Sequence, residues 1–504
     1  MSSGAPAPRS KVAARVALIR ARSGISPLAI LLLPVGLMAY AFFAQAAELI
    51  GQSITAVVML SVLAGLCGAG MLLRPSADRL ELFRVFSFYY LMAFCIAPLF
   101  EPAISMYVLE EPRPALLERT AALALFAFVS IGLGYHLPLY RTPPKLVLTR
   151  HDEYNAPLAI GVGLALFVIG AISFVALFVL AGGSAVILEG QGGLARTEFS
   201  FGLGWYYWTS LFMLPGGVVY FAAQASRTRL LAWLHAWPLV SAFALLMLLQ
   251  GRHRAMGPIL LMFAVSHYLI RRIRLTRLAV YAVAGLAFAI VMSTARSPSF
   301  RGTFATDPIG YTVAILRDFP DRGKEVLAGD IGRVDEVMII IDHVPDLMPY
   351  DWGWSLTIPL NPFRRLVLGP RSEAPAIGNR LYLIARPDMR TSLYTTGFLP
   401  SIVGEMRANF PFLVCFFPFL LFGMLLRYVY QRLILEGADF LAVAAYVLLG
   451  FHLSNTTINA FGQNSFEMLV VALPVLIVRK VARRRSRVGT RPPALPEPVP
   501  SPRA

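Results

Sequence analysis

The chain has 504 residues, of which 57% are hydrophobic and only 14% are charged, and its mean hydropathy is +0.65. A soluble domain carries about 25% charged residues, so this composition excludes an ordinary soluble protein and indicates a polytopic membrane protein. The formal net charge is +17, and twelve of these charges lie in residues 1–26 and 479–504. Each basic tail adjoins an apolar segment, which favours a role in membrane orientation over nucleic-acid binding.

The fold class predicted from hydropathy is an all-α polytopic integral membrane protein with about 12 transmembrane helices. A bilayer-spanning helix needs about 20 mostly apolar residues. Twelve segments meet this criterion: 27–47, 54–73, 84–103, 120–138, 157–181, 205–224, 231–250, 255–270, 277–295, 410–427, 438–455 and 465–479.

Orientation follows from the Lys and Arg residues of the short loops, which are enriched on the cytoplasmic side. They concentrate in alternate loops, at Arg74, Arg79 and Arg84, at Arg141, Lys145 and Arg150, at Arg227 and Arg229, at 271–277, and at Arg427 and Arg432. We therefore expect both termini to be cytoplasmic in a bacterial inner membrane. An alternative is a cleaved signal peptide ending near Ala44-Gln45-Ala46, although the apolar run is long for that.

Residues 296–409 contain no apolar run long enough to span a bilayer and hold thirteen basic and thirteen acidic residues. Long ordered loops are usually functional. We predict that this is one large, partly helical periplasmic loop and that shorter outer segments, including 104–119, 182–204 and 456–464, meet it. The predicted organisation is a basic tail (1–26), transmembrane helices 1–9 (27–295), the loop (296–409), transmembrane helices 10–12 (410–479) and a disordered tail (480–504).

Metal and cofactor signals are weak. The cysteines, Cys67, Cys95 and Cys415, lie in apolar runs without metal-ligand spacing, and the loop aspartates are scattered. No paired-histidine spacing, glycine-rich phosphate loop or Ser-His-Asp pattern is present. We expect no metal site and no cofactor.

Arg252 and Arg254 lie at the predicted outer end of an apolar helix. Ionisable groups are costly there and often functional, and guanidinium groups bind phosphate through paired hydrogen bonds. The alternative is that both side chains extend to the lipid headgroups. The same argument applies, with less support, to Arg196.

Within the loop, Val334, Val337, Met338, Ile341 and Val344 form a stripe at helical spacing, which predicts an amphipathic helix over 333–344 that packs on the membrane surface or the bundle. The stretch that follows contains Trp352 and Trp354 beside an acid. These rings could stack on sugars or belong to an interfacial aromatic belt.

A positively charged surface is predicted next, because basic residues outnumber acids between 347 and 409 and would attract an anionic substrate. The candidates are Arg364, Arg365, Arg371, Arg380, Arg386, Arg390 and Arg407. A salt-bridged surface is the alternative for most of them.

A short helix is expected after Pro400, which suits a first helical turn. Ser401, Glu405 and Asn409 would then share one face. The Glu405 carboxylate is a candidate general base or charge orienter, or only half of a structural ion pair.

The pattern over residues 182–464 resembles the bacterial oligosaccharide repeat-unit polymerases, the Wzy-type O-antigen and exopolysaccharide polymerases. The resemblance rests on four features. They are Gly251-Arg252, the passage from Gly353 and Ser355 to Pro362, Arg364 and Arg365, the run Gly397, Pro400-Ser401, Gly404-Glu405 and Asn409, and the one dominant outer loop. Some members of the family also carry an arginine eleven residues before a glycine, and Arg386 and Gly397 match that spacing.

The resemblance implies a metal-independent glycosyltransferase that joins oligosaccharide units carried on undecaprenyl diphosphate at the outer face of the inner membrane. Glu405, Arg252 and Arg254 would be catalytic. The implied substrate-binding residues are Arg196, Trp352, Trp354, Arg364, Arg365, Arg386, Arg390, Gly397, Ser401, Arg407 and Asn409. Implied partners are the bilayer, a chain-length regulator and a flippase.

Three other functions stay open. A ligase that moves a finished glycan from the lipid to another acceptor shares the same scaffold. A transporter or flippase of lipid-linked glycans would instead carry mid-span charge or repeat symmetry, and neither is evident. An acyltransferase would use an intramembrane histidine such as His452 or His267.

Overall fold

The computed structural model describes residues 53–72, 78–96, 111–137, 155–180, 204–227, 234–242, 252–269, 310, 313, 317, 332–368, 377–385, 400–436 and 439–489. Within these ranges every regular element is helical, which confirms the all-α prediction for this part of the chain. The predicted spans at 27–47 and 277–295 lie outside the described residues, so the total of twelve stays a prediction.

Four helices are long and apolar enough to cross a membrane within the described ranges, as befits a membrane protein. They are Ile54–Met71 within α3 (Ile54–Leu72), α5 (Arg113–His136), α6 (Ala156–Leu180), and Phe416–Leu435, which joins α20 (Phe416–Tyr430) to η11 (Gln431–Leu435). Two shorter apolar helices are α4 (Leu82–Leu91) continued by η2 (Met92–Ile96), and α21 (Phe440–Asn455).

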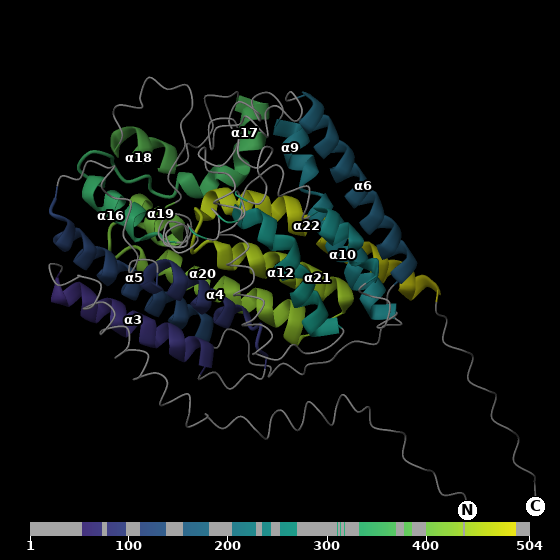
Figure 1. Ribbon diagram of the computed structural model, residues 1–504, viewed down its shortest axis with the longest axis horizontal. Coiled ribbons are helices and arrows are strands. Elements are labelled where there is room, and N and C mark those ends of the chain that lie inside the picture. Colours follow the sequence, from purple (N-terminus) through teal and green to yellow (C-terminus); the bar gives the residue numbers. More distant parts are fainter. Residues whose placement is uncertain are drawn as a thin grey trace, which may run out of the picture.

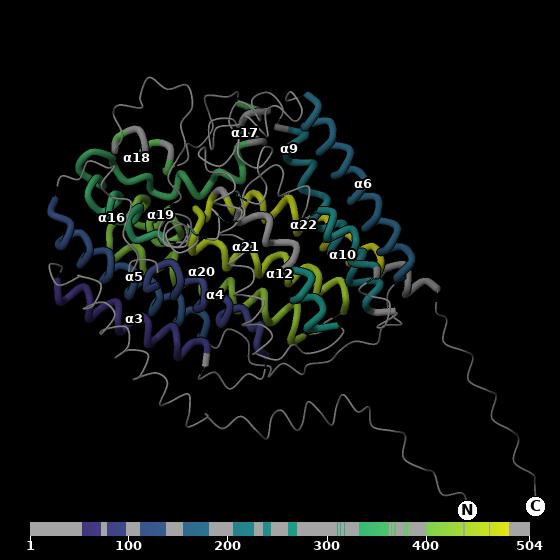
Figure 2. Tube along the Cα trace, viewed as in Figure 1, coloured from purple at the N-terminus to yellow at the C-terminus, as the bar shows by residue number. Residues whose placement is uncertain are grey.

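The remaining bundle elements are α9 (Gly204–Ser210), α10 (Met213–Arg227), η6 (Leu234–Ala236), α12 (Arg252–Leu269) and α22 (Phe461–Gly489). The predicted loop contributes α16 (Val334–His343), η8 (Ser355–Leu360), α17 (Asn361–Leu368), α18 (Ile377–Ala385) and α19 (Ser401–Asn409). Figure 1 shows α16, α18 and α19 toward the upper left edge of the view, above α3 and α5, and α17 at the top, level with the upper end of α6. The tube in Figure 2 follows the same green segments over that edge of the bundle.

Helices α5 and α20 cross at very short range because glycine faces each backbone. A Cβ atom on Gly134 would lie 2.0 Å from the Leu420 carbonyl oxygen, and one on Gly423 would lie 2.0 Å from that of Ile131. Small residues permit this approach in membrane helices, where dispersion contacts rather than the hydrophobic effect hold helices together. The loop's last helix, α19, leads directly into α20, so this crossing also fixes where the loop ends.

Polar contacts show which helix ends meet. At one end, Asp78 accepts hydrogen bonds from the hydroxyls of Tyr268 and Tyr430, each at 2.9 Å. The Arg479 guanidinium donates from Nε to Asp439 Oδ2 at 2.9 Å, and both residues also adjoin segments that the sequence predicts to be cytoplasmic. The structure thus brings predicted inner positions together with one another.

The opposite end collects predicted outer positions. The Glu111 backbone N–H donates to Asp342 of α16 at 3.0 Å, and the Ile402 N–H donates to the Thr456 carbonyl at 2.7 Å. Glu111 and Thr456, from two of the predicted outer segments, therefore both contact the helices between α12 and α20. Residues 104–110 and 182–203 lie outside the described residues, so the rest of that prediction is not tested.

The amphipathic helix predicted at 333–344 is present as α16, and it packs against α5, α18 and α19. The predicted stripe is only part of its buried surface. Ile339 and Ile340 are fully buried as well, in a small cluster with Ile377, Leu381 and Ala408. Because α18 covers the side of α16 away from α5, α16 is enclosed within a second layer rather than lying on a surface.

The glycine crossing gives a first prediction. Gly423→Ala would force α5 and α20 apart, and overpacking of this kind costs about 1–3 kcal/mol. We expect a lower midpoint of thermal unfolding for the purified protein, measured by fluorescence. Gly161→Ala in α6 is the matched control, because a Cβ there meets no atom within 4 Å. Equal shifts in the two variants would contradict the proposed role of the crossing.

Candidate functional site

The predicted short helix after Pro400 is present as α19, and its predicted polar face is turned inward. Ser401 and Asn409 are fully buried and Glu405 is 1% exposed. The face is buried because α16 packs on one side of α19 and the start of α22 contacts it on another. Sequence spacing correctly predicted that these three side chains share a face, but not that the face lies inside the protein.

The Glu405 carboxylate joins three separate segments of the chain. The Ser355 hydroxyl donates to Oε1 at 3.1 Å, and the backbone N–H of Gly462 donates to Oε2 at 3.0 Å and Oε1 at 3.3 Å. Asn409 completes the arrangement, because its Nδ2 donates to Ser355 Oγ at 2.7 Å. The carboxylate therefore ties α19 to η8 and to the first turn of α22.

Burial dominates the electrostatics of this carboxylate. Loss of hydration raises the pKa of Glu405 from its ordinary 4.5 to about 7, although the Gly462 N–H and the Ser355 hydroxyl act in the opposite direction. The nearby Asp351 raises the pKa further by charge repulsion. Glu405 can therefore gain or lose a proton near neutral pH.

Gly462 is a site residue that the sequence analysis missed. A Cβ atom there would lie 2.5 Å from the Ser355 carbonyl oxygen and 2.9 Å from Glu405 Oε1. Any side chain would push α22 away from η8 and break the bond to the carboxylate. No spacing rule singles out a glycine at the start of an apolar helix, so the sequence offered no signal for this role.

The turn from Tyr350 to Trp354 is held against the end of α19. The N–H groups of Asp351 and Trp352 donate to the carbonyls of Ala408 and Asn409 at 3.1 and 3.0 Å, and the Gly353 N–H donates to Asn409 Oδ1 at 2.8 Å. These bonds hold Trp352 at φ +50° and Gly353 at φ +86°. A left-handed conformation costs a residue with a side chain about 1–2 kcal/mol, so the bonds to α19 keep this turn in an unfavourable shape.

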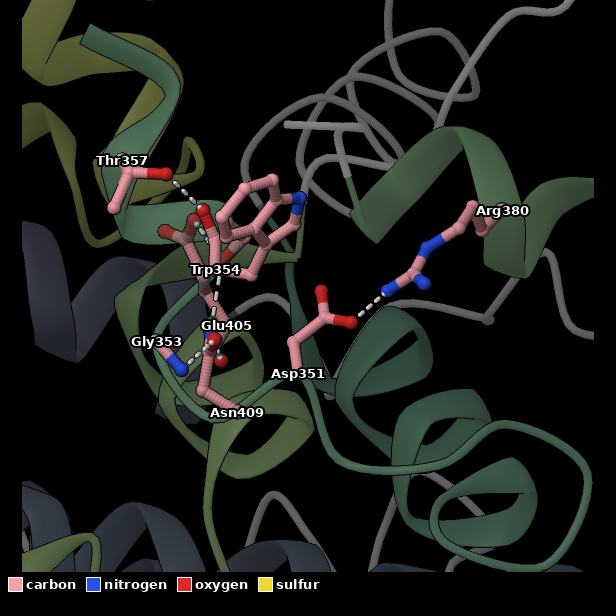
Figure 3. A network of polar contacts seen from close by, with 8 residues as sticks. Asp351, Gly353, Trp354, Thr357, Arg380, Glu405 and Asn409 are labelled. Atoms are coloured by element: carbon pink, nitrogen blue, oxygen red, sulfur yellow. Dashed lines mark hydrogen bonds and ion pairs between the residues drawn. The ribbon is translucent and has the colours of Figure 1, made fainter. Parts of the chain in front are cut away.

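The turn presents aromatic rings to the surface. Trp352 is 66% exposed and Trp354 is 45% exposed. Figure 3 shows Trp354 directed away from α19, while Glu405 and Asn409 lie beneath the turn and Asp351 points toward Arg380. The buried carboxylate and the exposed tryptophans are thus two sides of one assembly.

Three of the candidate arginines surround this turn. The guanidinium of Arg364 lies 4.2 Å from the ring centre of Trp354, and Arg380 forms an ion pair with Asp351. Arg407 is used internally, since it donates to the Tyr350 hydroxyl at 2.7 Å and to the Val344 carbonyl at 3.0 Å. Arg364 thus lies beside an exposed ring and Arg380 beside Asp351, whereas Arg407 supports the turn from the side of α19.

Other candidates are not placed relative to this site. Arg252 and Arg254 belong to the first turn of α12, and Arg365 belongs to α17, but their side chains lie outside the described set. Arg196, Arg386, Arg390 and Gly397 lie wholly outside the described residues. The structure therefore brings Glu405, Asn409, Arg407, Arg364 and both tryptophans together and places Ser401 buried at the start of α19. The role of every candidate in binding or catalysis stays a prediction.

Arg333 is a second residue that the sequence analysis passed over. Its side chain is only 2% exposed, and it donates from Nε to the Ile458 carbonyl at 2.5 Å and from Nη1 to Glu336 at 3.1 Å. It ties α16 to the turn that precedes Gly462. An arginine in a charged loop gives no sequence sign that it will be buried, because its burial depends on partners far along the chain.

The geometry separates two chemical capacities. Glu405 has its carboxylate oxygens engaged by protein donors, so it is arranged to position the turn, while the exposed rings and arginines are arranged to contact a ligand.

No protein-family model, curated protein or solved structure matches the chain. Function must therefore be argued from this geometry.

The pKa of Glu405 gives a second prediction. A carboxyl group whose pKa is higher in the folded than in the unfolded protein contributes stability that is complete below about pH 4.5 and is lost as pH rises through about 7. The full change is about 3 kcal/mol at 1.36 kcal/mol per pH unit. Glu405→Gln should remove it, so the difference in unfolding midpoint between wild type and variant should change between pH 5 and 8.

Thermal unfolding at a series of pH values measures this difference. Glu436→Gln, at the opposite end of the bundle, controls for the loss of one carboxylate. Parallel midpoint curves for wild type and Glu405→Gln would show that Glu405 does not titrate as described.

Proposed function

We propose that the protein is a polymerase that joins undecaprenyl-diphosphate-linked oligosaccharide units into O-antigen or exopolysaccharide. The observation that carries this proposal is the rigid turn with Trp352, Trp354 and Arg364, fixed by Glu405 at one end of an apolar helical bundle. Aromatic rings beside guanidinium groups suit a ligand that is part sugar and part phosphate. A position at the end of membrane helices suits a substrate whose lipid stays in the bilayer.

The proposed reaction is a glycosyl transfer. A hydroxyl of the acceptor unit attacks the anomeric carbon of the donor, and the bond from that carbon to the phosphate oxygen breaks. The proton of the hydroxyl passes to the leaving phosphate oxygen, and the lipid diphosphate leaves. The enzyme must align the hydroxyl and stabilise the charge on the leaving group. Guanidinium groups can supply the second function without a metal ion.

We assign Arg252 and Arg254 to the diphosphate. Arg364, Arg365, Arg386 and Arg390 are assigned to the diphosphate or the glycan, and Arg196 is kept with them as a further candidate. We assign Glu405 to orientation of the site. Direct proton transfer from the acceptor would require its bonds to Ser355 and Gly462 to be exchanged for a bond to the substrate.

The proposed side of the membrane gives a third prediction. We propose that the loop faces the periplasm of a bacterial inner membrane. The native cysteines are all buried, so introduced cysteines can be labelled against a low background. Asp346→Cys, in an exposed turn after α16, should react with a membrane-impermeant maleimide in intact spheroplasts.

Arg432→Cys is the matched control, because Arg432 is exposed near the end marked by the Asp78 contacts. It should react only after permeabilisation. Labelling with the reverse pattern would invert the proposed orientation.

The function itself gives a fourth prediction. Deletion of the gene from its host should leave surface glycan as single repeat units and cause the lipid-linked unit to accumulate. Long glycans retained on the lipid but missing from their final acceptor would instead indicate a ligase. Unchanged glycans would exclude both functions and favour transport. Electrophoretic sizing of the surface glycan and of the lipid-linked fraction measures each outcome.

Complementation tests the assigned residues. Arg252→Ala and Glu405→Ala should each fail to restore long glycan although the protein is inserted in normal amount. Arg432→Ala, which removes an arginine at the opposite end of the bundle, should restore it. Long glycan from both Arg252→Ala and Glu405→Ala would contradict the residue roles.

A further inference from the structure

We propose that the Trp352–Trp354 turn is a binding subsite for a neutral pyranose ring of the glycan substrate. This inference rests on the proposed function and adds to it the chemical class of the sugar and the residues that bind it. Three observations support it: the backbone that carries the exposed rings is fixed by hydrogen bonds, one ring is already covered on one face by a guanidinium group, and a buried carboxylate beside them has an oxygen with no donor among the described residues.

Rigidity is the first observation. The hydrogen bonds of Asp351, Trp352 and Gly353 to the end of α19 fix the backbone from which both rings project. Bonding of the Thr357 hydroxyl to the Trp354 carbonyl at 2.6 Å fixes the other side of the turn. A backbone that is fixed before binding loses little conformational entropy when a ligand arrives, which favours a recognition surface.

The second observation is the contact between Arg364 and Trp354. The guanidinium at 4.2 Å covers one face of the indole, and the ring is nevertheless 45% exposed. A pyranose has an apolar C–H face that can stack on an aromatic ring and hydroxyls at its rim that can reach polar groups. Arg364 lies close enough to the ring to contact such a rim.

The third observation is the carboxylate of Asp351. Its side chain is only 7% exposed and one oxygen is paired with Arg380, while no donor among the described residues reaches Oδ2. Arg364 Nη1 and Arg380 Nε likewise lack an acceptor. In Figure 3 the second oxygen of Asp351 points to the side between Trp354 and Arg380.

These unpartnered atoms identify the kind of group that fits. Oδ2 requires a donor and the two arginine nitrogens require an acceptor, and a sugar hydroxyl can be both. A carboxylate of an acidic sugar can only accept, and beside Asp351 it would meet like charge. The polar atoms around the turn therefore favour a neutral sugar over a uronate.

An interfacial aromatic belt is the main alternative for two exposed tryptophans. A belt requires only that amphipathic rings lie at headgroup depth. It does not require a left-handed backbone at Trp352 or an almost fully buried Asp351 with an unpaired oxygen. Both features are accounted for if the turn is shaped to hold a sugar ring.

Binding of lipid-free sugars to the full-length protein in lipid nanodiscs tests the subsite. The probes are short neutral hexose oligosaccharides and the same oligosaccharides oxidised to uronates, with affinity measured by calorimetry. Trp352→Ala, Trp354→Ala and Asp351→Asn should each bind the neutral probes about tenfold more weakly or worse. Trp205→Ala is the matched control, because Trp205 is 80% exposed in α9 and should leave affinity unchanged.

Several outcomes would overturn the subsite. They are absence of neutral-sugar binding to the wild-type protein, tighter binding of the uronates, or equal loss in Trp205→Ala. Nanodiscs containing brominated lipids add an independent readout, because bromine quenches the fluorescence of tryptophans that contact lipid. Quenching in the wild-type protein that disappears in both the Trp352→Ala and the Trp354→Ala variant would place the two rings in the bilayer interface and overturn the subsite.

The two proposals can fail separately. If gene deletion leaves glycan length unchanged, the polymerase is excluded, and binding of lipid-free sugars still reports on the turn. If deletion shortens the glycan and the sugars do not bind, the polymerase stands and the subsite is wrong.

Discussion

The described part of the protein depends most on one buried carboxylate. Removing a carboxylate from water is costly unless hydrogen-bond donors replace the lost hydration. Ser355 and the Gly462 N–H provide them for Glu405, and they come from η8 and α22, far apart in sequence. The bonds can form only if both elements are correctly placed against α19. The carboxylate therefore makes the shape of the segment from η8 to α19 depend on its packing against the apolar helices.

Two further constraints keep these elements in register. Arg333 links α16 to the Ile458 carbonyl just before α22, and the glycine crossing sets α20 against α5 immediately after α19. Arg333 joins the start of α16 to the bundle through a hydrogen bond, and the glycine crossing holds α20 at a point where the two backbones have no room to shift. The turn at Trp352 can remain in a left-handed conformation because the segment on which it rests is held at both ends.

The sequence predicted the local features of this arrangement better than the long-range ones. Helical spacing correctly predicted α16 and the shared face of Ser401, Glu405 and Asn409, since both depend on residues a few positions apart. The roles of Gly462 and Arg333 could not be predicted, because each depends on contact with a segment more than fifty residues away. The burial of the Glu405 face was missed for the same reason: spacing shows which side chains lie together, but not what covers them.

The arginines show why residue type alone cannot assign a ligand. Arg333, Arg364 and Arg407 belong to one charged loop, yet Arg333 is buried against carbonyl oxygens and Arg407 is bound to Tyr350 and Val344. Arg364 stacks on an exposed ring and has a nitrogen without an acceptor. A cation already satisfied by the protein must break those bonds to bind a substrate, at a cost of about 1–3 kcal/mol for each bond to a charged group. Of these three residues, Arg364 can bind an incoming ligand with the least loss, and its position beside Trp354 places a cation next to an exposed aromatic ring.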